Sequence, residues 1–133
     1  MREPRDAFHV AIPARDLDEA MDFYVAGLGA KLARRYADRI TLDFFGDQLV
    51  CHLAPDAVAG EPELYPRHFG VTFAREADFD RLLRLVEQRK LRVLREPARR
   101  FEGTAEEHRT VFLGDPSNNV LEFKWYVDPR MMY

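Results

Sequence analysis

The chain of 133 residues has little cysteine, no long apolar run and no large excess of charge of either sign. Cys51 is the only cysteine, which excludes an intrachain disulfide and a zinc site built from several cysteines. No apolar run approaches the roughly 18–20 residues that span a bilayer. The N-terminal stretch "MREPRDAF" also lacks the apolar core of a signal peptide. We therefore expect a cytoplasmic protein with no membrane partner.

The charge balance also argues against a nucleic-acid partner. Twenty basic and 23 acidic side chains give a net charge of −3, the arginines are scattered, and no nucleic-acid-binding motif occurs. The apolar fraction of 47% is typical of a globular protein, and the length is sufficient for one domain with a hydrophobic core. These properties indicate one globular domain and give no support for a nucleic-acid partner.

The same order of predicted elements occurs twice along the chain. Residues 7–14 alternate like a strand, and residues 15–30 have helical spacing, with Asp16 and Glu19 as a capping box. Three β-like runs follow up to residue 54, and residues 55–66, with three prolines, form a linker. A strand at 67–74, a helix at 78–90 and three strands up to 126 repeat the order. We predict one α+β domain, 1–133, made of two βαβββ modules at about 7–54 and 67–126.

Residues at matching places support an internal duplication. His9 and His68 each open a strand that precedes a helix, and "FFGD" and "FLGD" each lead into the last strand of a module. His52 and Glu122 fall at similar points of those last strands. The period of about 60–70 residues is longer than that of solenoid repeats, which indicates two paired modules.

Each of these four strands has one apolar face and a second face that carries His9, His52, His68 or Glu122. A carboxylate buried without a partner is very costly. Two imidazoles and one carboxylate bind a divalent metal and leave coordination positions open. Simpler interpretations remain: a single histidine on a strand is more often a hydrogen-bonded residue, and Glu122 can pair with Lys124. His108 lies in a polar loop, where we expect it to be solvated.

Three segments resemble the vicinal oxygen chelate superfamily, which includes glyoxalase I, type I extradiol dioxygenases and bleomycin-resistance proteins. They are "FHVAIPARDLDEAMDFYVAGLGAKL", "HFGVTF" and "FLGDPSNNVLEFKWY", and the resemblance covers about residues 7–126. It is nearest to the small two-module predicted extradiol dioxygenases. The resemblance implies a cupped, incomplete barrel of two βαβββ modules around a divalent metal.

The resemblance also implies a ligand set. The metal-binding histidines and glutamate of the dioxygenases match His9, His68 and Glu122. The ion expected is Fe(II), with Mn(II), Zn(II) or Ni(II) as alternatives. His52 is compatible with either a fourth ligand or an acid–base catalyst. The tyrosine that ring-cleaving enzymes place shortly before the metal glutamate is missing here, since no tyrosine occurs between Tyr65 and Tyr126.

The leading hypothesis is a metal-dependent, extradiol-dioxygenase-like oxidoreductase whose small substrate chelates the metal through two vicinal oxygens. His52 would move a substrate proton, and Gln48, Arg100 and Arg109 would bind the substrate. One alternative is a glyoxalase-like isomerase, lyase or epimerase. The other is a non-catalytic, resistance-type protein that binds a small molecule. We expect a homodimer, to which the apolar tail "WYVDPRMMY" contributes.

Overall fold

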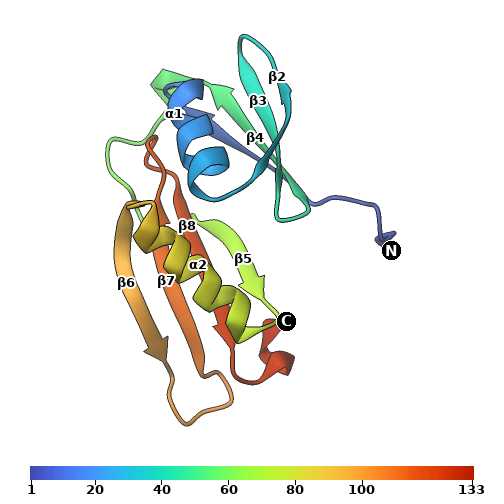
Figure 1. Ribbon diagram of the computed structural model, residues 1–133, viewed down its shortest axis with the longest axis vertical. Helices are drawn as coiled ribbons and strands as arrows, with labels where there is room; N and C mark the ends of the chain where they lie inside the picture. Colours follow the sequence, from blue (N-terminus) through green and yellow to red (C-terminus); the bar gives the residue numbers. More distant parts are fainter.

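The computed structural model describes all 133 residues and contains two βαβββ modules (Figure 1). The first module comprises β1 (His9–Ala14), α1 (Leu17–Met21) with its π-helical continuation η1 (Asp22–Gly27), β2 (Lys31–Arg35), β3 (Arg39–Phe44) and β4 (Asp47–Leu53). The second comprises β5 (Phe69–Phe73), α2 (Glu76–Gln88), β6 (Val93–Arg100), β7 (His108–Gly114) and β8 (Val120–Tyr126). Short 3₁₀ turns, η2 (Pro55–Ala57) and η3 (Pro129–Met132), follow β4 and β8. The predicted α+β fold is confirmed.

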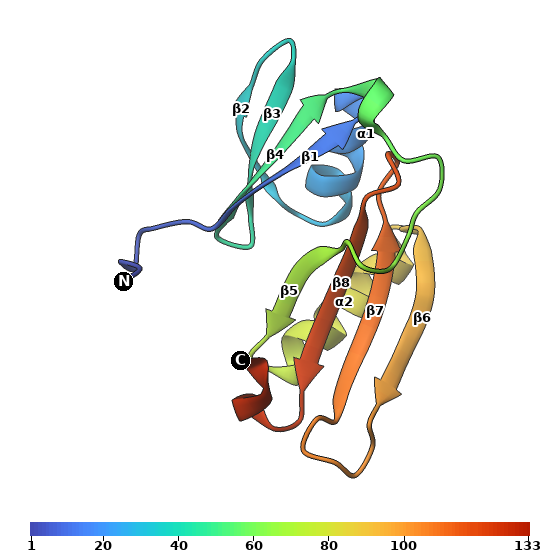
Figure 2. The same cartoon turned by 180° about the vertical axis from the view of Figure 1, so that it is seen from behind.

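Each module forms its own four-stranded mixed sheet, in the order β1-β4-β3-β2 and β5-β8-β7-β6. The first and last strands of each module run parallel, and the other neighbours are antiparallel. The two sheets are not closed into a barrel (Figure 2). We call the side of each sheet that faces away from its helix the outer face. No helix of the structure combines the length and apolar character that crossing a membrane requires.

The first helix begins where the sequence predicts. The Asp16 side chain accepts hydrogen bonds from the backbone N–H groups of Asp18 and Glu19, as an N-cap does. The predicted capping box is incomplete, because the Glu19 carboxylate pairs with the Arg15 guanidinium at 2.6 Å. Gly29, with φ +80°, adopts the left-handed conformation just after the helical segment ends.

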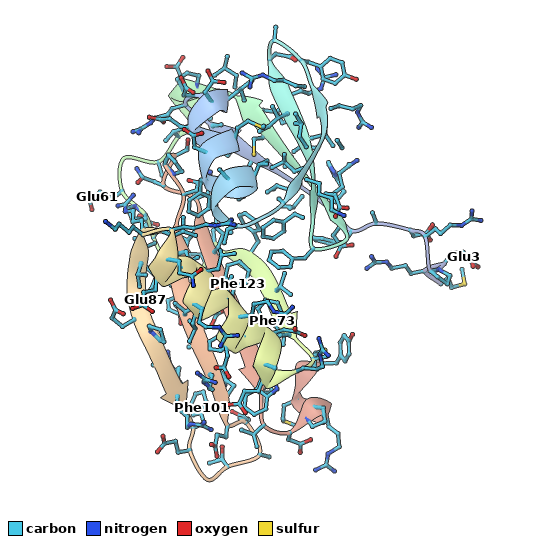
Figure 3. The ribbon with its side chains drawn as sticks, viewed as in Figure 1. Glu3, Glu61, Phe73, Glu87, Phe101 and Phe123 are labelled. Carbon is cyan, nitrogen blue, oxygen red and sulfur yellow. The ribbon has the colours of Figure 1, made fainter.

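The two modules pack against each other through their helix-covered sides. The Phe45 ring lies 5.9 Å from both Phe73 and Phe123, and the Phe44 ring lies 6.4 Å from Phe123. Figure 3 labels Phe73 and Phe123 beside α2. These contacts join both modules in one cluster of 20 buried apolar residues. The core therefore lies between the modules, and each sheet turns its outer face away from it.

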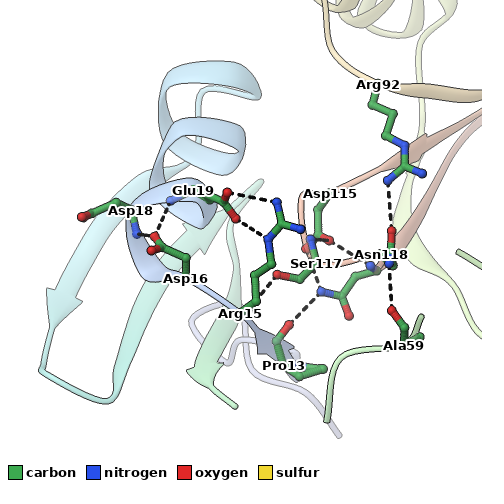
Figure 4. A network of polar contacts seen from close by, with 11 residues as sticks. Pro13, Arg15, Asp16, Asp18, Glu19, Ala59, Arg92, Asp115, Ser117 and Asn118 are labelled. Carbon is green, nitrogen blue, oxygen red and sulfur yellow. Dashed lines mark hydrogen bonds and ion pairs between the residues drawn. The ribbon is translucent and has the colours of Figure 1, made fainter. Parts of the chain in front are cut away.

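A buried carboxylate ties the end of the first strand to the start of the last (Figure 4). Asp115 accepts hydrogen bonds from the Tyr24 hydroxyl at 2.8 Å and from the Asn119 side-chain amide at 2.7 Å. It also accepts the backbone N–H groups of Ser117 and Asn119. The Asn119 amide donates in turn to the carbonyl of Pro13 at 2.9 Å. Burial raises the pKa of the Asp115 carboxyl, although these hydrogen bonds oppose the shift.

The expectation of a solvated His108 is wrong. This residue opens β7 and is buried, with its ring 4.9 Å from Tyr126. Its Nδ1 donates to the Glu106 carbonyl at 2.8 Å. A local carbonyl therefore hydrogen-bonds this imidazole, and cross-strand packing against Tyr126 shields it from solvent.

Candidate metal centre

The outer face of the second sheet brings two of the predicted ligands together. His68 precedes β5, Glu122 lies in the middle of β8, and the His68 Nε2 is 3.1 Å from the Glu122 Oε2. The His68 side chain is 25% exposed, whereas that of Glu122 is 9% exposed. A nearly buried carboxylate and a partly accessible imidazole therefore lie in contact on this face of the sheet.

Neighbouring groups fix how each of these two side chains is presented. The His68 Nδ1 contacts the Leu64 carbonyl at 2.8 Å, and because a carbonyl only accepts, Nδ1 carries the hydrogen. The Thr110 hydroxyl donates to the Glu122 Oε1 at 2.7 Å. In the neutral imidazole, the Nε2 lone pair thus points at a carboxylate oxygen. Two acceptors this close require a proton or a metal cation between them, so this donor pair fits a divalent metal.

A glycine allows β5 to approach the backbone of Glu122. Gly70 pairs with Glu122 across the two parallel strands. A Cβ at Gly70 would lie 1.8 Å from the Glu122 carbonyl oxygen, which no side chain tolerates. Glycine at this position therefore sets the distance between the strand that follows His68 and the strand that carries Glu122.

Lys124 offers Glu122 a second, longer contact. Its Nζ lies 3.7 Å from the Glu122 Oε2, on the same face of β8. The ion pair between Glu122 and Lys124 that the simpler interpretation predicts is therefore present, at a longer distance than the contact with His68. The Lys124 side chain is about as exposed as that of His68, so the distance of 3.7 Å, against 3.1 Å for His68, makes this the weaker of the two contacts.

The third predicted ligand does not join them within the chain. His9 opens β1, is exposed, and pairs with Gln48 on the outer face of the first sheet. No three histidine, cysteine, aspartate or glutamate side chains come together as a metal-binding group. A cleft of about 800 Å³ between β1, the linker and the start of β5 includes His68 but neither His9 nor Glu122 among its walls. The outer faces of the two modules therefore do not converge in a single chain.

The strand register corrects the predicted equivalence of His52 and Glu122. Glu122 pairs with Gly70, which lies two residues after His68. In the first module the residue two positions after His9 is Ala11, and it pairs with Val50. His52 pairs instead with Pro13, two residues further along β4, which is about 7 Å at the usual rise of a strand. The first module therefore offers an apolar side chain where a fourth metal ligand would lie.

The predicted substrate-binding residues lie on opposite faces. Gln48 neighbours His9 on the outer face of the first sheet, and Arg100 pairs with His108 on the outer face of the second. Arg109 lies on the helix side, where its Nη1 contacts carboxylate oxygens of Glu76 at 2.9 Å and Asp80 at 2.7 Å. The structure therefore does not bring Arg109 to the candidate centre, because its guanidinium contacts carboxylates of α2.

Three residues near His68 escaped the sequence analysis. The rings of Tyr65 and Phe112 lie 5.6 Å from the His68 ring, and 5.8 Å from each other. The Arg95 guanidinium lies over both, 5.4 Å from the Phe112 ring and 5.9 Å from Tyr65. The register of β6 against β7 places Arg95 beside Phe112, and no short motif encodes that register.

Comparison with known proteins agrees with this architecture. A sequence model of the glyoxalase/bleomycin resistance protein/dioxygenase superfamily matches residues 7–123. A crystal structure of a glyoxalase/bleomycin resistance protein/dioxygenase from Alicyclobacillus acidocaldarius is 65% identical, with a TM-score of 0.95 and coverage of 100% of both chains. No curated protein sequence matches the chain.

More distant structures share the fold alone. The fosfomycin resistance protein FosX from Listeria monocytogenes is 14% identical, with a TM-score of 0.73 over 94% of this chain and 97% of its own. Lactoylglutathione lyase from Agrobacterium tumefaciens is 20% identical, with a TM-score of 0.69 over 93% of this chain and 96% of its own. The chain belongs to the glyoxalase/bleomycin resistance protein/dioxygenase superfamily, whose members typically bind divalent metals and small-molecule substrates.

Proposed function

We propose that the protein is a metal-dependent, extradiol-dioxygenase-like oxidoreductase that acts on a small substrate with two vicinal oxygens. The observation that carries this proposal is the pair on the second sheet, where the His68 Nε2 faces the Glu122 Oε2 at 3.1 Å. The Leu64 carbonyl and the Thr110 hydroxyl hold this pair in the form that binds a cation.

The metal that fits this donor set is divalent and keeps open positions. His68 and Glu122 would hold it together with His9, and two histidines with one carboxylate favour Fe(II). When bound, the ion would supply Lewis acidity and a template for the substrate oxygens. Val50, at the place equivalent to Glu122, supports a set of three protein ligands rather than the four of the glyoxalase-like alternative.

We propose further that two copies of the chain complete the site. His9 is exposed on the outer face of the first sheet, and no other ligand of its own chain lies beside it. A two-fold homodimer that sets the first sheet of one copy against the second sheet of the other would bring the partner's His9 to His68 and Glu122. Two-fold symmetry then creates two identical centres per dimer.

The remaining residues would act on the substrate. His52 lies on the outer face about 7 Å beyond the position equivalent to Glu122, so part of the substrate fits between its imidazole and the metal. There it would take and return a substrate proton as the acid–base group. Gln48, on the same face, would hydrogen-bond the substrate.

Co-expression of two variants tests the shared site. His9→Ala and Glu122→Ala should each lose Mn(II) binding when expressed alone. A mixed dimer of the two carries one site with both changes and one site that is intact. Random pairing of equal amounts should therefore restore about a quarter of the wild-type Mn(II) sites. Calorimetry of the co-expressed protein measures this fraction.

The result separates the alternatives. A site formed within one chain would give no recovery, and Mn(II) bound in full by either variant alone would refute the ligand assignment. Oxygen consumption on addition of candidate catechols to the Fe(II) form supports the oxidoreductase. Turnover of a substrate with the metal bound but no oxygen consumed would instead favour the glyoxalase-like isomerase.

A further inference from the structure

We infer that the substrate of this centre is a small organic anion, and that Arg95 binds its carboxylate, phosphonate or phosphate group. The inference rests on the proposed function for the metal half of the site. The assignment of an anion-binding role to Arg95 follows from charges and contacts on the outer face of the second sheet. It can be tested without metal.

Arg95 lies in the same row of paired residues as the metal-ligand candidate. Arg95 pairs with Phe112, Phe112 pairs with Glu122, and Glu122 pairs with Gly70. The Phe112 ring lies 5.6 Å from the His68 ring on one side and 5.4 Å from the Arg95 guanidinium on another. One aromatic ring therefore contacts both the candidate ligand and the guanidinium.

The Arg95 guanidinium has no carboxylate partner in the chain, in contrast to nine other arginines that do. Those nine are Arg2, Arg15, Arg35, Arg39, Arg75, Arg81, Arg99, Arg109 and Arg130. Its recorded contacts are the faces of Phe112 and Tyr65, which leave the hydrogen-bond donors of the guanidinium free. A planar guanidinium with free donors matches a carboxylate or phosphate in a bidentate manner.

The surrounding face is cationic as well. Its paired rows contain three cations, Arg95, Arg100 and Lys124, and one carboxylate, Glu122. Glu122 is already engaged by His68 and Thr110. Lys124 lies 3.7 Å from Glu122, whereas Arg95 and Arg100 have no carboxylate partner, and unpaired charge of one sign on a surface attracts ligands of the other sign. The face therefore favours an anionic substrate over a neutral or cationic one.

Aromatic walls indicate an organic rather than an inorganic anion. The Tyr65 side chain from the linker is 54% exposed and lies against both His68 and Phe112. Such a ring supplies apolar contact area beside a polar anchor, as small-molecule sites commonly do. The substrate class that fits is an organic anion whose vicinal oxygens lie at the metal while its acidic group lies at Arg95.

Inorganic phosphate is the probe for the anion site. We would titrate it into the metal-free wild-type protein and into each variant at fixed pH and ionic strength, and follow the backbone amide signals of β6 and β7 by NMR. Arg95→Gln should weaken phosphate binding about tenfold or more, because a charged bidentate contact is lost. Arg95→Lys, which keeps the charge but not the fork, should lie in between. Arg84→Gln, an equal charge change on an exposed position of α2, is the matched control and should bind as wild type does.

Equal phosphate affinity in wild type and Arg95→Gln would overturn the inference, as would an equal loss in Arg84→Gln. Mn(II) calorimetry on the same proteins keeps the two proposals apart, since Arg95→Gln should bind the metal as wild type does. A protein that takes up phosphate through Arg95 but no Mn(II) would refute the proposed metal centre and leave the anion site standing.

Discussion

At the scale of single residues, the candidate centre depends on groups that touch no substrate. The Leu64 carbonyl fixes the tautomer of His68, and the Thr110 hydroxyl satisfies one oxygen of Glu122. The two ligand candidates are predictable from the sequence because imidazole and carboxylate are conspicuous on apolar strands. Thr110 and Leu64 are not, since a hydroxyl on a strand and a carbonyl in a linker have no sequence signature of their own.

Replacing Thr110 by valine tests this support. The change keeps the shape of the side chain and removes the hydrogen bond to a nearly buried carboxylate, which contributes about 1–3 kcal/mol. We expect Mn(II) affinity to fall about 10–100-fold, as losses of such supporting bonds generally do. Thr72→Val, on the same face and paired with Lys124, is the matched control. Equal affinities in the two variants, measured by calorimetry, would exclude the role of Thr110.

At the scale of elements, periodicity predicted the strands and helices well because each buries one face. The predicted runs overlap β1 to β8 and both helical segments, although several bounds differ by a few residues. The pattern does not predict strand register to the same extent, because a shift of two residues keeps every side chain on the same face of the sheet. His52 therefore seems equivalent to Glu122 in the sequence, although Val50 occupies that position.

The pairing of β5 with β8 depends on Gly70. A methyl group there would lie 1.8 Å from the Glu122 carbonyl oxygen, so Gly70→Ala must separate the two strands or displace Glu122. We expect a loss of stability of about 1–3 kcal/mol, the usual cost of overpacking, together with loss of Mn(II) binding. Gly60→Ala is the control, because nothing lies within 4 Å of a Cβ at that position. Urea unfolding measures both, and an unchanged midpoint for Gly70→Ala would contradict the close approach described above.

At the scale of the whole molecule, the helix-covered sides of the modules meet and the outer faces do not. The sequence predicts the duplication, and the family resemblance implies a cup of two modules around one metal. Strand patterns cannot show whether two modules meet through their outer faces or through their helices, because both arrangements bury one apolar face of every strand. Phe45, against Phe73 and Phe123, accounts for the arrangement observed.

The junction between modules predicts a pH dependence. Burial raises the pKa of Asp115 above 3.8, so the folded state favours the protonated carboxyl more than the unfolded state does. Its contribution to stability is full below pH 3.8 and disappears as the pH rises through the raised pKa. The free energy of unfolding of wild type minus that of Asp115→Asn should therefore fall with rising pH across this window. Other carboxylates are common to both proteins, so their effects cancel.

Urea titrations of both proteins at a series of pH values measure this difference. A difference that rises with pH would mean that the hydrogen bonds from Tyr24 and Asn119 outweigh burial. A constant difference would mean that Asp115 titrates alike in the folded and unfolded protein.

In the proposed dimer, the separation of His9 from His68 and Glu122 would make protein concentration a variable of catalysis. If one copy supplies the first imidazole and another supplies the remaining donors, dilution below the dissociation constant disables both pockets at once. Specific activity, which is constant for an enzyme that works as a monomer, would then decline as the preparation is thinned. Genetic fusion of two copies in tandem would abolish that decline.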